Sequence, residues 1–518
     1  MNPSLKKQIT SYVLVLICGL LLFGCKDVNQ TSEKIVLEES IKIEKYRPQF
    51  HFTPKEKWMN DPNGLVYNNG TYHLFYQYYP DSTVWGPMHW GHAKSKDLLT
   101  WKHRPIALYP DSLGYIFSGS AVIDNENTAG FGKDAMVAIY TYHDPVKEKA
   151  GQIDYQTQGI AYSLDDGETW TKYKGNPVIS NPGIRDFRDP KVSWYEEKEA
   201  WQMVLVAKDE VQFYESKDLK AWEKISTFRF DDKPPLGVWE CPDLFQLKVE
   251  GTEEEKWVLI VSHGGNSLPN GGSGTRYFVG DYDGTTFTTD QKESQWIDYG
   301  TDNYAGVTYN NEPNGKRIFI GWMSNWNYAT TTPTEKWRSA MTLPRELQLI
   351  KIDNKYLVKS KLVDGFEAIT EDISKEDLEG NFPTQFQYTD LQQSIIAFNA
   401  KINNKLQIQF SNSEGDTYSL GYEKAIGKFY TNRTNSGNVN FNENFAKSSY
   451  QTMPIGIYNN MKVTIILDAS SIEIFINDGE YVMTNQIFPN SNFTKFEVLK
   501  ENDSKIDNLN IRKVATIL

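Results

Sequence analysis

Cysteine is scarce in this 518-residue chain, which has only three, at positions 18, 25 and 241. The first two fall in an apolar N-terminal stretch, so Cys241 has no partner for an intrachain disulfide in the rest of the chain. The seven histidines show no metal-ligand spacing, and three cysteines are too few for a zinc site. We therefore expect no bound metal and no cofactor.

Positive charge is also in short supply, because 54 Lys and Arg face 67 Asp and Glu, for a net charge of −13. Nucleic acid binding depends on basic residues that neutralise phosphates, so a nucleic acid partner is not expected. Long segments with a 3.6-residue apolar period are missing, which counts against an α/β fold. The length predicts two or more domains, and no pattern specifies an oligomeric state.

The one long apolar run is near the N-terminus, over residues 12–23, and two lysines precede it. It is too short to span a bilayer comfortably and is typical of an export signal. The run ends at Cys25 in a pattern that resembles a bacterial lipobox, in which this cysteine carries the lipid. We predict a lipoprotein signal peptide over 1–25, a flexible tether over 26–45, and an exported protein anchored in the membrane through Cys25. It would face the periplasm or the cell surface, and a plain signal peptide or an uncleaved anchor is the alternative.

Aromatic residues are abundant, at 14% of the chain, and they favour strands. Five short runs rich in aromatic and β-branched residues start at positions 72, 136, 203, 257 and 317, which gives a repeat of 54 to 67 residues. Such a period of β units, separated by Asp-Gly turns, indicates a propeller of four-stranded blades. After Leu347 the repeat stops, and alternation through Ile472, Ile474 and Ile476 with a hairpin turn at Asp478-Gly479 indicates a sandwich. We predict an all-β chain with a five-bladed β-propeller over 46–348 and a C-terminal β-sandwich over 349–518.

Three acidic motifs precede three of the five runs, by 11, 14 and 17 residues. They are Asn60-Asp61-Pro62-Asn63-Gly64, Arg188-Asp189-Pro190 and Glu240-Cys241-Pro242-Asp243. Equivalent places in three blades would bring the acids together near the propeller axis. Any one motif alone is more often a turn. Three crowded carboxylates raise one another's pKa, however, and such crowding is more often functional than structural.

These motifs, extended to Trp58-Met59-Asn60-Asp61, Phe187-Arg188-Asp189-Pro190 and Trp239-Glu240-Cys241-Pro242, resemble the signatures of glycoside hydrolase family 32, the invertase, inulinase and levanase family. The resemblance runs almost continuously from residue 48 to 347, and Ser471-Ile472-Glu473-Ile474-Phe475 resembles a segment of the family's C-terminal sandwich. Trp85 to His92 and Trp322 to Trp326 resemble bacterial levanases most. The resemblance to family 32 implies the same two domains and a retaining mechanism on β-fructofuranosides.

The resemblance also implies roles for individual residues. Asp61 would be the nucleophile, Glu240 the general acid/base, and Asp189 would bind fructose hydroxyls and stabilise the transition state. Hydrogen bonds from Asn60 and backbone groups are expected to lower the pKa of Asp61 and keep it ionised. The residues implied in substrate binding are Trp58, Asn60, Gln77, Trp85, Phe117, Ser118, Arg188 and Trp322. A structural ion pair is the alternative for Arg188, and ordinary core packing is the alternative for Trp85 and Trp322.

The expected function is therefore hydrolysis of fructans from the chain end with release of fructose. Levan is the preferred polymer in this hypothesis, with inulin and sucrose also accepted. Three alternatives remain open at this stage: an endo-levanase, a fructosyltransferase of the same family, and a non-catalytic fructan-binding lectin. The intact acidic trio disfavours the lectin, because an inactivated propeller should have lost at least one of the three.

Overall fold

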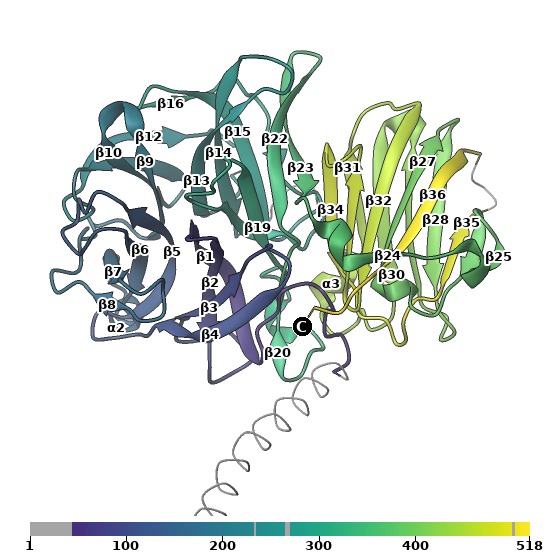
Figure 1. Ribbon diagram of the computed structural model, residues 1–518, viewed down its shortest axis with the longest axis horizontal. Coiled ribbons are helices and arrows are strands. Elements are labelled where there is room, and N and C mark those ends of the chain that lie inside the picture. The colour runs from purple at the N-terminus through teal and green to yellow at the C-terminus, as the bar shows by residue number, and fades with distance from the viewer. Residues whose placement is uncertain (1–43, 233–234, 265–269, 500–502, 518) are drawn as a thin grey trace, which may run out of the picture. The chain divides into compact units, whose positions relative to one another are not determined.

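The computed structural model describes residues 44–232, 235–264, 270–499 and 503–517 (Figure 1). The predicted signal peptide and the anchor at Cys25 lie outside the described residues. The described chain is nearly all-β, which confirms the predicted fold class: a five-bladed propeller followed by a sandwich. No helix in the described ranges is long and apolar enough to cross a membrane.

Five separate sheets make up the first part of the chain. The first contains β1 (Lys57–Asn68), β2 (Thr71–Tyr79), β3 (His89–Ser95), β4 (Trp101–Leu108) and the late strand β20 (Trp337–Arg338). The second contains β5 (Tyr115–Asp124), β6 (Ala135–His143), β7 (Gln156–Ser163) and β8 (Thr171–Lys172). The third contains β9 (Phe187–Tyr195), β10 (Ala200–Ala207), β11 (Glu210–Ser216) and β12 (Glu223–Arg229).

The fourth sheet contains β13 (Trp239–Lys248), β14 (Glu255–His263), β15 (Gly274–Tyr282), β16 (Phe287–Thr288) and β17 (Gln295–Trp296). The fifth contains β18 (Tyr304–Thr308), β19 (Arg317–Met323), β21 (Ala340–Met341), β22 (Arg345–Ile352) and β23 (Lys355–Leu362). The repeated runs form the second strand of each sheet: β2, β6, β10, β14 and β19. All nine residues of β6 are buried, which is why these runs are continuous rather than alternating.

The first strands of the five sheets form a closed ring. β1 contacts β5, β5 contacts β9, β9 contacts β13, β13 contacts β18, and β18 returns to β1. Lys57 and Trp58 of β1 also pair in parallel with Trp337 and Arg338 of β20, so the end of the propeller is joined to its start. Because the ring is closed, the five first strands all face one axis, and the side chains at one end of these strands meet at that axis.

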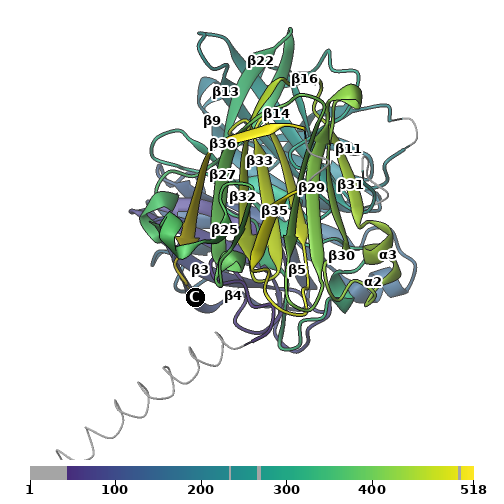
Figure 2. The same ribbon diagram turned by 90° about the vertical axis from the view of Figure 1, so that its right-hand side faces the viewer.

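Two sheets form the sandwich (Figure 2). One runs in the order β24 (Thr370–Asp372), β36 (Lys505–Val514), β27 (Ser394–Lys401), β32 (Asn460–Asp468), β33 (Ser471–Ile476) and β34 (Tyr481–Gln486). The other runs in the order β25 (Glu379–Asn381), β26 (Gln385–Gln387), β35 (Lys495–Val498), β28 (Lys405–Ser411), β29 (Thr417–Glu423), β30 (Lys428–Asn435) and β31 (Tyr450–Pro454). Ile396, Ile465 and Ile474 pack against Ile408 and Phe410 between the sheets.

Helices are few and short. The α-helices are α2 (Pro145–Lys149) and α3 (Glu443–Lys447), and short 3₁₀ turns occupy Glu196–Lys198, Ala329–Thr331, Phe366–Ile369, Lys375–Asp377, Leu391–Gln393 and Lys424–Ile426. The fifth blade continues to Leu362, because β23 pairs with β22 along its whole length. We therefore propose to place the domain boundary after Leu362, beyond the expected boundary at residue 348.

Buried charges join the sandwich to the propeller. His51, just before β1, hydrogen-bonds Asp468 at 2.7 Å and Glu473 at 2.8 Å. Arg345 of the fifth blade donates to Glu473 at 2.6 Å and to Asp298 at 2.9 Å. Burial lowers the pKa of His51, but the two carboxylates outweigh it and raise that pKa to about 9. His51 is therefore protonated at neutral pH and balances the buried acids.

Candidate active site

All five first strands carry the same irregularity at one end. In each, two residues stand opposite a single residue of the second strand, which is the pattern of a β-bulge. The bulged pairs are Asn60-Asp61, Phe117-Ser118, Asp189-Pro190, Cys241-Pro242 and Ala305-Gly306. Three of these residues adopt a positive φ: Asp189 at 63°, Cys241 at 45° and Ala305 at 54°. A bulge re-aims side chains, and here it gathers residues of five blades into one site.

Asp61 is held by donors from three blades. Ser118 Oγ donates to its Oδ2 at 2.6 Å, Asn60 Nδ2 donates to its Oδ1 at 3.1 Å, and Cys241 Sγ lies 3.5 Å from Oδ2. Trp58 Nε1 in turn donates to Asn60 Oδ1 at 2.7 Å and orients that amide. Burial nevertheless raises the pKa of Asp61, and the nearby charge of Glu240 adds to the increase. The expectation of a lowered pKa is wrong, because removal from water outweighs the hydrogen bonds.

Asp189 is the most buried of the three acids, with 6% of its side chain exposed. The backbone N–H of Cys241 donates to its Oδ2 at 3.0 Å, and its own N–H donates to Thr141 Oγ1 at 2.9 Å. Burial raises the pKa of Asp189 to about 7, with Arg188 opposing the shift and the other two acids adding to it. Asp189 therefore titrates near neutrality in the free protein.

Glu240 is held through both carboxyl oxygens. Arg188 Nη2 donates to Oε1 at 3.0 Å, and the hydroxyl of Tyr304 donates to Oε2. Arg188 also donates to Asp186 at 2.8 Å, so the guanidinium is fixed from two sides. The Glu240 side chain is 22% exposed, which leaves it reachable from solvent. Glu240 thus has cationic and phenolic donors, whereas Asp61 has hydroxyl, amide and thiol neighbours.

Two of the predicted substrate-binding tryptophans are fully buried, Trp58 and Trp322. Their rings lie 6.1 Å apart, and each also packs on Trp326. Trp322 contacts the ring of Tyr304 edge-on at 6.3 Å. Trp58 therefore supports Asn60 through a hydrogen bond, and Trp322 supports Tyr304 through a ring contact.

The remaining predicted residues differ in accessibility. Gln77 is buried opposite the first bulge, and its amide donates to Asn63 Oδ1 at 2.7 Å and to the carbonyl of Ile116 at 3.0 Å. Trp85 is 40% exposed and lies edge-on to Phe117, with 6.0 Å between ring centroids. Phe117 stacks on His143 at 4.3 Å. An exposed aromatic edge therefore borders Ser118 and Asp61.

Tyr304 and the thiol of Cys241 were not among the predicted site residues. A spacing signal for Tyr304 was present, since it lies 13 residues before Arg317 at the start of β19, as the acids precede their own runs. Asn303-Tyr304-Ala305-Gly306 contains no acid, so its sequence does not resemble the three acidic motifs. Among the described residues, no group of histidine, cysteine, aspartate or glutamate could hold a metal ion.

Two carboxyl groups in different environments at one site, one held by neutral donors and the other by an arginine and a phenol, fit the pair of acids that a glycosidase uses. The chain belongs to glycosyl hydrolase family 32. The model of that family's N-terminal domain matches residues 51–360, and the model of its C-terminal domain matches residues 365–513. This protein is accordingly a glycosidase that acts on β-fructofuranosides.

Individual relatives agree with the family. Levanase of Bacillus subtilis is 45% identical over 491 residues, which covers 92% of this chain and 71% of that protein. The crystal structure of exo-inulinase from Aspergillus awamori matches with a TM-score of 0.81 at 35% identity, covering 92% of this chain and 99% of that one. The structure of a fructofuranosidase from Schwanniomyces occidentalis complexed with fructose matches with a TM-score of 0.80 at 31% identity. The match covers 91% of this chain and 99% of that one.

The raised pKa of Asp189 predicts a pH-dependent cost to stability. The folded state keeps this proton up to about pH 7, whereas the unfolded chain loses it near 3.8, so stability falls as pH rises through that window. Asp189→Asn removes the titration, and we expect its Tm to exceed that of the wild type by roughly 2–4 °C at pH 8 and to match it at pH 4. Differential scanning calorimetry at both pH values checks this. Asp209→Asn, at an exposed turn, is the control and should match the wild type at both.

Proposed function

We propose that the protein is a retaining hydrolase of fructans in which Asp61 is the nucleophile, Glu240 the general acid/base and Asp189 the transition-state stabiliser. The observation that carries the proposal is the contrast between the two carboxylates at one site. Asp61 accepts hydrogen bonds from Ser118 and Asn60, and Glu240 is bound by Arg188 and Tyr304. A retaining pair needs two carboxyl groups in different environments on opposite sides of one bond.

The reaction then runs in two displacements. A carboxylate oxygen of Asp61 attacks C2 of the fructosyl unit while Glu240 gives its proton to the departing glycosidic oxygen, so the C2–O bond breaks and a fructosyl ester forms. Glu240, now ionised, takes a proton from water as that water attacks C2. The ester bond breaks, fructose leaves, and both carboxyls return to their starting states. Ser118 and Asn60 hold Asp61 in line throughout.

Three acids in one place suit this transition state. It has oxocarbenium character, so positive charge develops beside carboxyl groups that are costly to ionise in the free protein. The same crowding raises the pKa of Asp61 and Asp189 before substrate binds, with burial as the larger cause. The developing cation favours the ionised forms of Asp61 and Asp189, so their electrostatic interaction with the reacting centre is more favourable in the transition state than in the free site.

Substitution of the two acids separates their roles. Asp61→Asn should abolish turnover of every substrate, because the amide is not a nucleophile. Glu240→Gln should lower kcat on sucrose by about 10²–10⁴-fold but keep the first-step burst from an aryl fructoside, whose leaving group needs little protonation. Stopped-flow detection of the aryl alcohol measures the burst, and Glu223→Gln on an outer strand is the control.

An equal loss on both substrate classes would contradict the acid/base assignment of Glu240. NMR of the first-formed anomer tests the retaining step separately, since a β-fructoside should release β-fructose before mutarotation. Release of the α-anomer would mean inversion and would remove Asp61 as nucleophile.

We further propose exo-action, with levan as the preferred polymer and inulin and sucrose as further substrates. The similarity to a levanase and to an exo-inulinase supports this choice. The exposed edge of Trp85 and Phe117 beside Ser118 offers an apolar wall for one fructosyl unit. A fructosyltransferase would have the same acids, so product analysis at high sucrose distinguishes it by the appearance of longer oligosaccharides.

Timed digestion of levan tests the cutting mode. We expect free fructose as the product from the earliest samples, because a site for a terminal unit releases one sugar per event. Parallel digestions of inulin and sucrose rank the three substrates. An early ladder of oligosaccharides on chromatography would instead establish an endo-levanase.

The location of the protein is also a proposal. The name of a related enzyme, the extracellular exo-inulinase of Aspergillus niger, supports export, and the run before Cys25 supports a lipid anchor. Cys25→Ala should move the protein from the membrane fraction to the soluble fraction on immunoblots. Cys18→Ala, within the same run, should leave it in the membrane. Membrane retention of Cys25→Ala would indicate an uncleaved helix.

A further inference from the structure

The segment directly before Tyr304 lies along the sandwich. Tyr299 N–H donates to the carbonyl of Val482 at 2.8 Å, and Asp302 N–H donates to that of Thr484 at 3.3 Å. Thr484 N–H donates back to Asp298 at 2.8 Å. Gly300 lies so close to Thr484 that a Cβ would come within 2.1 Å of its carbonyl oxygen. Because β34 is the last strand of its sheet, residues 298–302 cover an edge that would otherwise be open.

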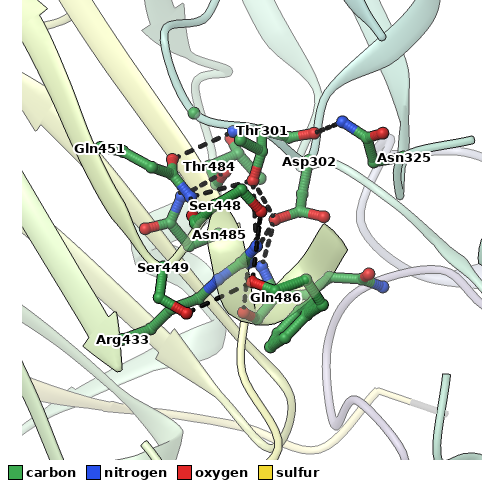
Figure 3. A network of polar contacts seen from close by, with 12 residues as sticks. Thr301, Asp302, Asn325, Arg433, Ser448, Ser449, Gln451, Thr484, Asn485 and Gln486 are labelled. Carbon is green, nitrogen blue, oxygen red and sulfur yellow. Dashed lines mark hydrogen bonds and ion pairs between the residues drawn. The ribbon is translucent and has the colours of Figure 1, made fainter. Parts of the chain in front are cut away.

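A buried arginine of the sandwich holds the end of this segment (Figure 3). Arg433 of β30 donates from Nη1 to Asp302 Oδ2 at 2.8 Å, and both side chains are fully buried. The same carboxylate oxygen accepts the backbone N–H of Gln486 at 2.9 Å, and its partner Oδ1 accepts the hydroxyl of Tyr328 at 2.7 Å. Thr301 Oγ1 also donates to Oδ2 at 3.0 Å, so both oxygens of Asp302 are occupied and two of their four donors come from the sandwich.

Two further sandwich side chains act on the same region. Gln451 donates to Thr301 Oγ1 at 2.9 Å and accepts the Thr301 N–H at 3.1 Å. Gln486 donates from Nε2 to the carbonyl of Met323 at 3.1 Å, next to Trp322. The sandwich thus binds the chain on two sides of the Tyr304–Trp322 contact. Figure 3 shows the first of these sides, where Gln451 meets Thr301.

We propose that Arg433 is a positioning residue for the general acid/base, acting through Asp302 and Tyr304 on Glu240. Asp302 is two residues from Tyr304, and the next residue, Ala305, is at the bulge with a φ of 54°. Little slack therefore separates the anchored segment from the phenol. The sandwich, on this view, supplies part of the catalytic geometry in addition to stability.

The consequence concerns one of the two oxygens of Glu240. If the segment shifts, Oε2 loses the Tyr304 donor while Oε1 keeps Arg188. Glu240 is then held from one side only and can turn away from the departing oxygen. Proton transfer to a poor leaving group should suffer most, because a misplacement of about 1 Å can lower the rate roughly 100-fold. Asp61 and its donors lie on other blades, and the hydrogen bond from Ser118 to Asp61 has no contact with the segment.

The test compares leaving groups in the full-length enzyme. The variants are Arg433→Met, Arg433→Lys and the double variant Arg433→Met/Asp302→Asn, which leaves no unpaired buried charge. Tyr304→Phe gives the reference behaviour, because it removes the donor directly. Ile408→Ala, in the core between the two sandwich sheets, controls for lost stability. The measurement is kcat and KM on sucrose and on an aryl fructoside, with Tm for each variant.

We expect Arg433→Met and the double variant to lower kcat on sucrose by about tenfold or more, with little change on the aryl fructoside, as Tyr304→Phe does. Arg433→Lys should recover part of that loss. Ile408→Ala should lower Tm and leave the ratio of the two kcat values unchanged. If Arg433→Met does not fold, Asp302→Asn alone is judged by the same ratio.

The deciding quantity is the ratio of kcat on sucrose to kcat on the aryl fructoside. Variants of Arg433 or Asp302 that lower Tm but keep this ratio at the wild-type value, like Ile408→Ala, would overturn the proposal. The inference rests on the proposed role of Glu240, and the reference variants separate the two failures. A wild-type ratio in both Tyr304→Phe and Glu240→Gln would refute the acid/base assignment itself. A changed ratio in those two, with none in the Arg433 variants, would refute only the positioning role.

Discussion

Three carboxyl groups are held together and largely out of water at one end of the propeller axis, and the rest of the site depends on this constraint. Burial is the larger cause of the raised pKa of Asp61 and Asp189, and repulsion among the acids adds to it. Asp61, Asp189 and Glu240 come from three blades, and each accepts hydrogen bonds from a neighbouring blade. Ser118 donates to Asp61, the Cys241 N–H to Asp189, and Arg188 and Tyr304 to Glu240. All five blades contribute to this balance. It depends on the closed ring of first strands, because an open sheet would let the acids move apart. The free enzyme is thus strained electrostatically in the direction that a cationic transition state relieves.

The backbone carries a second part of the strain. Asp189, Cys241 and Ala305 adopt positive φ within their bulges, a conformation that costs a non-glycine residue of the order of 1 kcal/mol or more. Residues keep such a backbone conformation only where the surrounding packing and hydrogen bonds hold it in place. For Ala305 the surroundings include the sandwich, through the segment that Arg433 and Gln451 hold. The buried pairs between the domains are therefore better understood as devices for geometry than as sources of net stability.

Much of the fold was accessible from the sequence for identifiable reasons. The middle of the second strand in each blade is buried on both faces, so β6 and its equivalents appear as continuous apolar runs, and five runs predicted five blades. The acids were also identified, because Asp61, Asp189 and Glu240 precede these runs at similar distances. Tyr304 occupies the equivalent place in the fifth blade, but a tyrosine in a strand-rich chain does not stand out. The burial of Trp58 was equally hidden, and that of Trp322 was only an alternative, since composition cannot tell a supporting indole from an exposed one.

The sequence by itself determined the repeat, the two domains and the three acids, because burial periodicity and turn chemistry are local properties of the chain. Only the tertiary structure decided how those acids are held. The bulge is a property of strand pairing, the donors on Glu240 come from residues 52 positions before it and 64 after it, and Arg433 reaches Asp302 across 131 positions. The pKa of Asp61 shows the same contrast between sequence and structure. Its neighbours in sequence predicted a lowered pKa, whereas burial by distant blades raises it. Spacing along the chain determines which acidic side chains lie at equivalent places in the blades. Long-range packing determines the charge and the orientation of each of them.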